Sequence, residues 1–415
     1  MRIADIEAFV FDAGWQSWTF VKVSTDEGVV GWGECSVPRA PFAVQGAVED
    51  IKNILLGKDP RAYEMRFADM ARLGIQSPLG VRAQAAAGVE LALIDIKAKA
   101  LGISVVELFG GPTREDLRLY WSHCGTTRAL YPQLGTPPIR TMDDIHALGK
   151  EVVASGYTAL KTNILLPGNP SSAHFHGFGG GPGTTDQVAD NAMLSHIETL
   201  IGTFRDAVGP KIDICLDLNF NFKPESCIRI ARMLEPYKLM WLEIDMYSPE
   251  AMRNIRDSSR TPLCTGENLI YMREFLPYFQ NRSADVFMVD VPWVGFSQAK
   301  KVGELAQVFE YNMAPHNYYS HLSTFISASL CAVLPNVHIM ETDVDELPIK
   351  SELMTNVPEI VNGRMKIPTG PGWGTEIRED VLRAHPWKKA KGVLYLFGVG
   401  SWGGHSALAA PLVSY

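Results

Sequence analysis

Six ionisable side chains recur at a nearly constant interval through the second half of the sequence. Each ends or follows a short apolar run, and the successive intervals are 26, 24, 23, 26 and 25 residues. One strand plus one helix of a (β/α)8 barrel takes roughly that length, so each interval would advance one strand and bring all six groups to one mouth. A lone carboxylate at a strand end is more often a helix N-cap or a solvated group, but six in phase predict a functional ring. The six are Asp217, Glu243, Glu267, Asp290, His316 and Glu341.

The first three members of this series, Asp217, Glu243 and Glu267, have the chemistry of a metal site. Like charges held close together in a partly dry pocket raise one another's pKa, so three carboxylates stay ionised only beside a cation. Ligation by oxygen alone favours a hard ion, Mg²⁺ first and Mn²⁺ as a substitute. Such an ion would bind a substrate carboxylate and stabilise the charge that develops when the proton α to that carboxylate is removed.

The elements that must position these groups alternate along the chain after a Gly-Gly-Pro turn at 110–112. Short apolar runs alternate there with helix-like segments, such as 224–234, 249–258, 271–280, 297–308 and 324–333. This alternation is typical of an α/β fold with a (β/α)8-type barrel. The eight candidate strands are residues 117–122, 159–164, 212–218, 239–244, 263–266, 286–289, 312–314 and 337–340.

The region before the barrel has a different pattern. Residues 3–11, 18–24 and 28–34 alternate as an antiparallel meander, and residues 42–102 follow with helical periodicity. We therefore expect an N-terminal α+β capping domain that the C-terminal segment completes by packing against it. The predicted divisions are 1–115 for the capping domain, 116–378 for the barrel and 379–415 for the C-terminal segment.

One connection in the barrel region is unusually long. Residues 165–190 are rich in Gly, Pro, Ser and His, and a loop of that length is usually functional or disordered. Its glycine run lacks the Lys-Ser/Thr ending of a phosphate-binding loop. His174 and His176 are either the lining of a lid over the site or, as we favour, solvated loop residues.

Composition excludes several classes of partner. The net charge is −8 and no Lys/Arg cluster marks a nucleic-acid surface, so nucleic acid is not expected. The uncharged stretch 392–415 holds too many Gly and Ser for a membrane span, and we expect a packed tail there. Six scattered cysteines and an N-terminus without a basic, apolar leader favour a cytoplasmic protein with reduced thiols.

Local motifs are spread over nearly the whole chain. They are Gly31-Trp32-Gly33-Glu34, the segment Ala92 to Lys99, Glu107-Leu108-Phe109-Gly110-Gly111, Asp217-Leu218-Asn219, Trp241-Leu242-Glu243, Gly266-Glu267, Asp290 near Gly295, Ala314-Pro315-His316-Asn317 and Pro371-Gly372-Trp373-Gly374. Together these motifs resemble the enolase superfamily, in its mandelate racemase branch. The resemblance implies a Mg²⁺ site at Asp217, Glu243 and Glu267, a base dyad of His316 and Asp290, a small-molecule carboxylate substrate and a homo-oligomer.

The dyad has a physical basis apart from the family. A carboxylate beside an imidazole fixes the tautomer and raises the pKa of the ring, which gives a base able to take a carbon-bound proton. A histidine alone would more often be structural, but beside the phased carboxylates we favour catalysis for His316. Glu341 would lie opposite the metal, where it either donates a hydrogen bond to an enediolate when protonated or makes a structural contact.

The second predicted strand departs from the family pattern. It carries Lys161-Thr162-Asn163, whereas the branch often has Lys-x-Lys, whose second lysine is a base on the face opposite the histidine. Asn163 in that place argues against racemisation. A Lys-x-Asn strand is similar to that of galactonate dehydratases. Those enzymes have a histidine where this chain has Asn219, so the identity of their substrate cannot be assigned to this chain. Lys161 would neutralise the substrate carboxylate or, if its pKa were lowered, act as a base.

These features together predict a Mg²⁺-dependent acid-sugar dehydratase that converts an aldonate or aldarate to its 2-keto-3-deoxy product. Asn163, Asn219 and two tryptophans of the cap, Trp15 and Trp18, are the candidate substrate-binding residues, although tryptophans there are as often plain packing. The alternatives are a racemase or epimerase with Lys161 as second base, a lactone cycloisomerase, and a non-catalytic carboxylate-binding relative.

Overall fold

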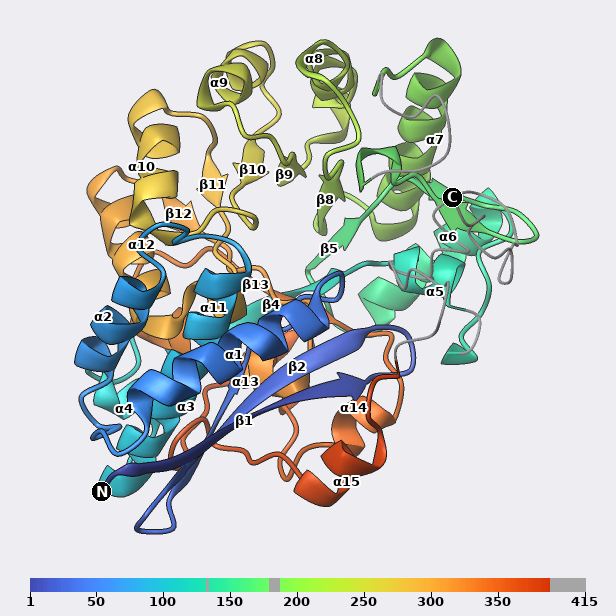
Figure 1. Cartoon of the computed structure of the whole chain (residues 1–415). Helices are drawn as coiled ribbons and strands as arrows, with labels where there is room; N and C mark the ends of the chain where they lie inside the picture. The colour runs from blue at the N-terminus through green and yellow to red at the C-terminus, as the bar shows by residue number, and fades with distance from the viewer. Residues whose placement is uncertain (132–133, 179–186, 389–415) are drawn as a thin grey trace, which may run out of the picture.

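The computed structural model describes residues 1–131, 134–178 and 187–388. The chain opens with a three-stranded antiparallel sheet, formed by β1 (Ile3–Asp12), β2 (Ser17–Thr25) and β3 (Val30–Glu34) in that order. Helices α1 (Pro41–Leu55), α2 (Tyr63–Leu73), α3 (Val81–Leu101) and the short α4 (Val105–Leu108) follow. The predicted meander and helical region are thus confirmed, and together they form a cap over one side of the barrel (Figure 1).

Helix α3 is buried on nearly every side because it lies between the cap sheet and the barrel. Two glycines of β3 permit this close approach. A Cβ atom on Gly31 would lie 2.1 Å from the carbonyl oxygen of Ala92, and one on Gly33 would lie 2.0 Å from that of Gly88. Any larger residue at these positions would push the strand away from the helix.

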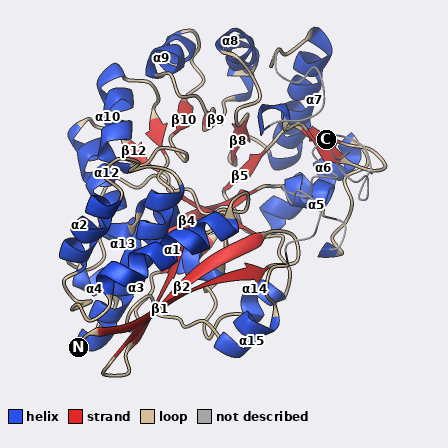
Figure 2. Ribbon diagram, in the orientation of Figure 1, coloured by secondary structure: helices blue, strands red, loops and turns tan. Residues whose placement is uncertain are grey.

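Eight parallel strands form the barrel, with helices outside them (Figures 1 and 2). β13 pairs with β4 on one side, and an isolated bridge between Met313 and Val337 closes the ring on the other. Buried strand side chains such as Tyr120, Cys215 and Trp241 fill the interior. The strands are β4 (Asp116–Ser122), β5 (Ala159–Thr162), β8 (Asp213–Asp217), β9 (Trp241–Glu243), β10 (Leu263–Thr265), β11 (Val286–Phe287), β12 (Asn312–Met313) and β13 (Met340–Asp343).

The outer helices alternate with these strands, as the sequence predicted. They are α5 (Thr126–Leu130), α6 (Met142–Ala154), α7 (Asn191–Val208), α8 (Pro224–Met233), α9 (Pro249–Asp257), α10 (Tyr271–Asn281), α11 (Val291–Val294), α12 (Phe296–Val308), α13 (His321–Val333) and α14 (Ile349–Glu352). Helices such as α7, α8 and α10 bury apolar residues, and a helix that follows a strand begins at the strand end where the site is built.

Three parts of the barrel differ from the sequence prediction. The eighth strand was placed at 337–340 but runs over Met340–Asp343, because pairing with β4 continues into polar residues at the mouth, where the apolar pattern has ended. A hairpin of β14 (Ile360–Val361) and β15 (Arg364–Lys366) adds antiparallel to β4. The long connection contains a second hairpin, β6 (Leu165–Leu166) with β7 (Ser172–Ala173).

The chain returns to the cap after the barrel. α15 (Glu379–Ala384) lies beside β1, and the backbone N–H of Trp387 donates to the carbonyl of Val10 at 2.9 Å. The predicted C-terminal tail at 392–415 lies outside the described residues. Among the helices of the described ranges, none combines the length and apolar character that a membrane crossing requires.

Three buried carboxylates of the cap accept hydrogen bonds from the barrel side of the seam. Glu34 on β3 accepts from the backbone N–H of Ser323 at 3.1 Å. Glu90 on α3 accepts from the first two backbone N–H groups of α12, at 2.7 and 3.0 Å. Asp95, also on α3, accepts from the backbone N–H of Trp373 at 3.0 Å. The cap is therefore fixed directly over the strand ends that carry the site.

Candidate active site

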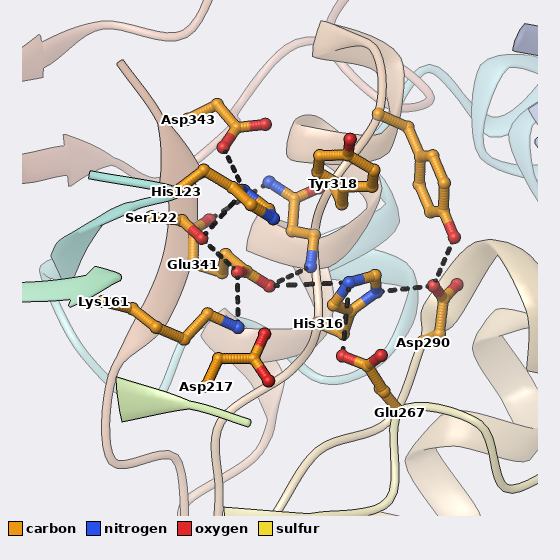
Figure 3. Close-up of polar contacts among 12 residues, drawn as sticks. Ser122, His123, Lys161, Asp217, Glu267, Asp290, His316, Tyr318, Glu341 and Asp343 are labelled. Carbon is orange, nitrogen blue, oxygen red and sulfur yellow. Dashed lines mark hydrogen bonds and ion pairs between the residues drawn. The ribbon is translucent and has the colours of Figure 1, made fainter. Parts of the chain in front are cut away.

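A cavity of about 470 Å³ opens at the carboxyl ends of the barrel strands, beneath the cap. The cap contributes the loop 37–39 to its wall, and the barrel contributes the polar floor. The barrel groups that the chemistry below uses are His123, Lys161, Asn163, Asp217, Glu267 and His316. Glu243, Asp290 and Glu341 lie immediately behind this lining and touch it through hydrogen bonds and ion pairs. Figure 3 shows these contacts for Asp290 and Glu341.

The imidazole of His316 is held between two carboxylates. Its Nδ1 lies 2.7 Å from Oδ2 of Asp290, and its Nε2 faces Glu267 at 3.5 Å. Asp290 is fixed in turn, because it caps α11 through the N–H of Trp293 and accepts from the hydroxyl of Tyr319 at 2.8 Å. Burial alone would lower the pKa of His316, but the charge of Glu267 and the Asp290 contact, with Glu341, outweigh burial and raise that pKa to about 10. The ring is an acid–base group with one nitrogen directed at the cavity.

Lys161 is clamped between two carboxylates on the neighbouring side. Its Nζ lies 2.9 Å from Oε1 of Glu243 and 2.9 Å from Oε1 of Glu341. Burial opposes its charge, but these two carboxylates prevail and hold the Lys161 pKa well above its usual range. Lys161 is thus a fixed positive charge at the cavity floor, which suits neutralisation of an anion rather than proton abstraction.

Glu341 is an ionised acceptor in this arrangement. It accepts from the hydroxyl of Ser122 and from the backbone N–H of Asn317 at 2.8 Å, as well as pairing with Lys161. Burial would raise its pKa, but the charges of Lys161 and His316 bring it down to about 2. The protonated donor considered for Glu341 from the sequence therefore does not match its surroundings, which consist of donors.

Both candidate asparagines orient Asp217. Asn219 donates its backbone N–H to Oδ1 of Asp217 at 2.7 Å and its amide to Oδ2 at 2.9 Å, from a backbone with φ +48°. Asn163 donates its amide to Asp217 Oδ2 at 3.1 Å. They line the cavity as expected for substrate-binding residues, but in this state their amide hydrogens serve the carboxylate.

The carboxylate oxygens of Asp217, Glu243 and Glu267 are chemically suited to bind a hard divalent cation. Burial raises the pKa of Asp217 and raises that of Glu243 to about 8, and Glu267 adds to both rises. The Lys161 ammonium pairs with Glu243, and the His316 ring faces Glu267, so each offsets part of this negative charge. Within the described ranges no three carboxylate, imidazole or thiol groups already converge as a metal site. Glu243 pairs with Lys161, Glu267 faces His316 and Asp217 accepts from the two asparagines, which leaves negative charge for a cation to neutralise.

Asp245 is an acidic neighbour that the sequence analysis did not select. It follows Glu243 by two residues, so it continues the same side of the strand, and burial with the charges of Glu267 and Asp217 raises its pKa well above the usual range. Its Oδ2 is buried and has no hydrogen-bond partner among the described residues. In the sequence, the signal that could have identified Asp245 was the two-residue alternation of β9, which continues beyond the apolar run.

The two cap tryptophans occupy different places. Trp15 packs its ring 5.0 Å from that of Tyr131 and 5.4 Å from that of Tyr318, and both tyrosines line the cavity. Trp18 is buried in the cap core, where it stacks on Phe11 at 6.0 Å. The position of Trp18 does not support the predicted contact with substrate, since the hydrophobic pattern of β2 points this side chain inward.

The two histidines of the long connection also differ in their exposure to solvent. His174 is buried and stacks on Phe222, with burial lowering its pKa to about 4, so the prediction of a solvated residue is wrong for it. His176 is exposed, as predicted. Neither ring lines the cavity, although their neighbours Phe175 and Gly177 do. The connection forms a wall of the site through those two residues.

Comparison with known proteins places this geometry in a family. Residues 144–381 match the family model described as enolase C-terminal domain-like, and residues 8–110 match the mandelate racemase / muconate lactonizing enzyme N-terminal domain. The chain belongs to the enolase superfamily, in its mandelate racemase branch. The family and the cap-and-barrel fold inferred from the sequence motifs are thereby confirmed.

Curated relatives in the enolase superfamily include two sugar-acid dehydratases. D-xylonate dehydratase of Haloferax volcanii is 28% identical over 392 residues, which cover 92% of this chain and 89% of the relative. D-gluconate dehydratase of Thermoproteus tenax is 29% identical over 398 residues, covering 92% of this chain and 74% of the relative.

A solved enolase-superfamily structure from Burkholderia xenovorans strain LB400 is more similar in sequence. It is provisionally named L-alanine-DL-glutamate epimerase, is 38% identical, and superposes with a TM-score of 0.91 over 94% of this chain and 99% of that chain. A second structure under that name is bound to magnesium and fumarate, with a TM-score of 0.90.

Proposed function

We propose that this enolase-superfamily member is a Mg²⁺-dependent acid-sugar dehydratase. It would remove the proton α to the carboxylate of an aldonate or aldarate and eliminate the β-hydroxyl, giving a 2-keto-3-deoxy acid. The observation that carries the proposal is the His316–Asp290 dyad, a base directed at the cavity, opposite a second strand whose only lysine is ion-paired. The names of the two curated relatives support the substrate class.

In this proposal His316 removes the α-proton through Nε2. Asp290 holds Nδ1, which fixes the tautomer and stabilises the imidazolium that forms. Lys161 supplies a fixed positive charge beside the developing enediolate, and its two carboxylate partners keep the ammonium in place. These chain residues account for abstraction and for stabilisation of its product.

Asp217, Glu243 and Glu267 are the residues that would hold Mg²⁺, with Mn²⁺ as a substitute. When bound, the ion would neutralise the substrate carboxylate and acidify the adjacent C–H. Glu267 contributes the largest share of the rise in the His316 pKa. A cation bound to Glu267 would offset the charge of that carboxylate and so lower the pKa of His316 again. The magnesium in the Burkholderia structure supports this assignment.

An isomerase is the second candidate, since the 38% identical structure is provisionally named as an epimerase. Epimerisation by direct proton transfer needs acid–base groups on both faces of the carbon. Lys161, the residue considered for the second face, is held by Glu243 and Glu341, and Asn163 cannot transfer a proton. A lactone cycloisomerase needs only one base, so the site does not distinguish it from a dehydratase. The two activities are distinguished by the product that each forms.

The test is a panel of aldonates, aldarates and their lactones incubated with the protein and Mg²⁺ in D₂O and followed by proton NMR. A 2-keto-3-deoxy product from one or a few acids, lost in His316→Asn, supports the proposal. Deuterium at C2 with a new epimer and no keto acid supports the isomerase instead. No reaction with any acid, from protein that binds Mg²⁺, contradicts both.

A further inference from the structure

A second histidine–carboxylate pair reaches the same cavity from neighbouring strands. His123 directly follows β4, and its Nδ1 lies 2.8 Å from Oδ1 of Asp343, the last residue of β13 (Figure 3). The side chain of His123 lines the cavity, with 16% of its surface exposed, and Asp343 behind it is 8% exposed. The pair therefore repeats, at the junction of β4 and β13, the arrangement of His316 and Asp290.

The contacts of His123 determine which nitrogen can react. Asp343 accepts from Nδ1, where the hydroxyl of Ser122 also lies at 3.2 Å. Across the described ranges no protein group hydrogen-bonds Nε2, which is the nitrogen left for the cavity. The Tyr318 ring contacts both imidazoles, with centroids 4.4 Å from His123 and 6.2 Å from His316. A molecule in the cavity can thus meet both imidazoles.

The backbone at His123 gives independent support. Its φ of +46° is in the left-handed region, which residues other than glycine seldom adopt. This conformation turns the chain sharply out of β4 and directs the ring over the mouth, and its carbonyl then accepts from the N–H of Thr126 at the start of α5. Such conformations persist where the surrounding structure enforces them, frequently at functional sites.

Dehydration requires a second proton transfer, to the leaving hydroxyl, for which the His316 imidazolium formed by abstraction and the imidazole of His123 are candidate acids. A β-hydroxyl leaves as water only if an acid protonates it. Lys161 is tied to Glu243 and Glu341, and the amides of Asn163 and Asn219 have no transferable proton. His123 is an imidazole beside the cavity that abstraction by His316 leaves unused.

We propose that His123, oriented by Asp343, is the acid that protonates the departing hydroxyl; this role rests on the proposed dehydratase function. His316 takes the C2 proton, the C2–H electrons form the enediolate, and the C3–O bond then breaks as His123 Nε2 donates its proton, releasing water. The resulting enol becomes the 2-keto acid when the His316 imidazolium gives its proton to C3 and the neutral His123 takes the proton of the C2 hydroxyl. Both imidazoles therefore end the cycle in their starting protonation states.

The experiment compares His123→Gln with His316→Asn on two substrates in D₂O. The first is the acid sugar that the wild type dehydrates, and the second is its 3-deoxy-3-fluoro analogue, whose fluoride leaves without being protonated. For H123Q we expect kcat for water loss to fall about 10²–10⁴-fold. Deuterium exchange at C2 and fluoride release should stay within about tenfold of wild type. H316N should lose all three reactions.

Two further variants separate a chemical from a structural role. His338→Gln, an exposed histidine at the opposite end of the barrel, should match wild type in all three reactions. Asp343→Asn should slow water loss and shift its pH profile, while fluoride release is spared. Water loss at the wild-type rate in H123Q overturns the proposal, as does equal loss of exchange, water loss and fluoride release in a folded H123Q. Formation of a C2 epimer that requires His123 would make it a second base and also overturns it.

Failure of the dehydratase assignment gives a different result. In that case wild-type protein produces neither C2 exchange nor keto acid from any acid sugar, and the role of His123 as leaving-group acid falls with it. Loss confined to water elimination in H123Q cannot arise in that way, because exchange at C2 must then be present.

Discussion

Glu34, the last residue of cap strand β3, and Ser320, which caps barrel helix α13, are hydrogen-bonded through their side chains. Glu34 also accepts from the hydroxyl of Ser36 at 2.6 Å and from the N–H of Ser323 at 3.1 Å. Burial raises the pKa of Glu34 to about 7, although each of these donors lowers it. The contact between the cap and the barrel therefore includes a carboxyl group whose pKa lies near neutrality.

Glu34→Gln should change the pH dependence of stability in a defined direction. The folded pKa, about 7, exceeds the ordinary value of 4.5, so the folded state binds the proton more tightly. The resulting stability is complete below about pH 4.5 and is lost as pH rises through 7. The free energy of unfolding of wild type minus that of E34Q should thus fall by about 3 kcal/mol over this window. Urea unfolding of both proteins across pH 4.5–8 measures this difference. Glu304→Gln, on the surface of α12, is the control. A difference between wild type and E34Q that does not change with pH contradicts the prediction.

Asp290→Asn should reduce turnover without unfolding the protein. The amide keeps the shape of the carboxylate but cannot stabilise the imidazolium of His316, so kcat should fall about 10²–10⁴-fold. Tyr319→Phe is the matched control, since it removes only the 2.8 Å hydrogen bond from the far side of Asp290. Its kcat should stay within about tenfold of wild type. Equal losses in D290N and Y319F would show that the whole hydrogen-bonded chain, rather than the dyad, is required.

Lys161→Met should make the protein depend on a divalent cation for stability. Removing the ammonium leaves Glu243 and Glu341 buried without their partner, at a cost of about 3–5 kcal/mol. Mg²⁺ should then raise the thermal midpoint of K161M more than that of wild type, because it replaces a lost positive charge. Lys350→Met, which breaks the pair between the buried Lys350 and the partly exposed Glu346 elsewhere, should show no added response to Mg²⁺. Identical responses in both variants would contradict a cation site at these carboxylates.

The two cap tryptophans should give opposite phenotypes when replaced by alanine. Trp18 is fully buried, so W18A should lose about 3–5 kcal/mol of stability. Trp15 packs on Tyr131 and Tyr318 at the cavity wall, so W15A should raise KM several-fold with a smaller loss of stability. Unfolding curves and steady-state kinetics of the two variants check this, and a raised KM in a stable W18A would contradict the placement.

The positions of the carboxylates on the barrel were predictable because strand phase is a local property. Each apolar run ends where its strand reaches the mouth, so Asp217 and Glu243 close β8 and β9 as the spacing requires. Lys161 was expected to face inward on the same ground. Its partners were not predictable, since Glu243 and Glu341 reach it from other strands and only the closed ring brings them together.

His123 and Asp343 were missed for a related physical reason. Both lie just beyond an apolar run, where the strand continues or turns without any hydrophobic signal. Asp343 ends a strand that was predicted to stop at residue 340, and the reversed φ of His123 has no marker such as glycine. In a barrel, the polar residues that directly follow an apolar run are therefore the hardest to assign from the hydrophobic pattern. They are also the residues that lie at the mouth, where the reactive groups gather.

The three buried carboxylates at the seam bear on how molecules reach the cavity. Glu34, Glu90 and Asp95 each accept from at least one backbone N–H group across the seam, and a backbone N–H cannot turn toward another acceptor. Swinging the cap aside as a unit would strip these donors, at about 1–3 kcal/mol for each buried group. Movement of the cap as a unit is therefore costly, whereas a short wall segment such as residues 37–39 lies outside these hydrogen bonds.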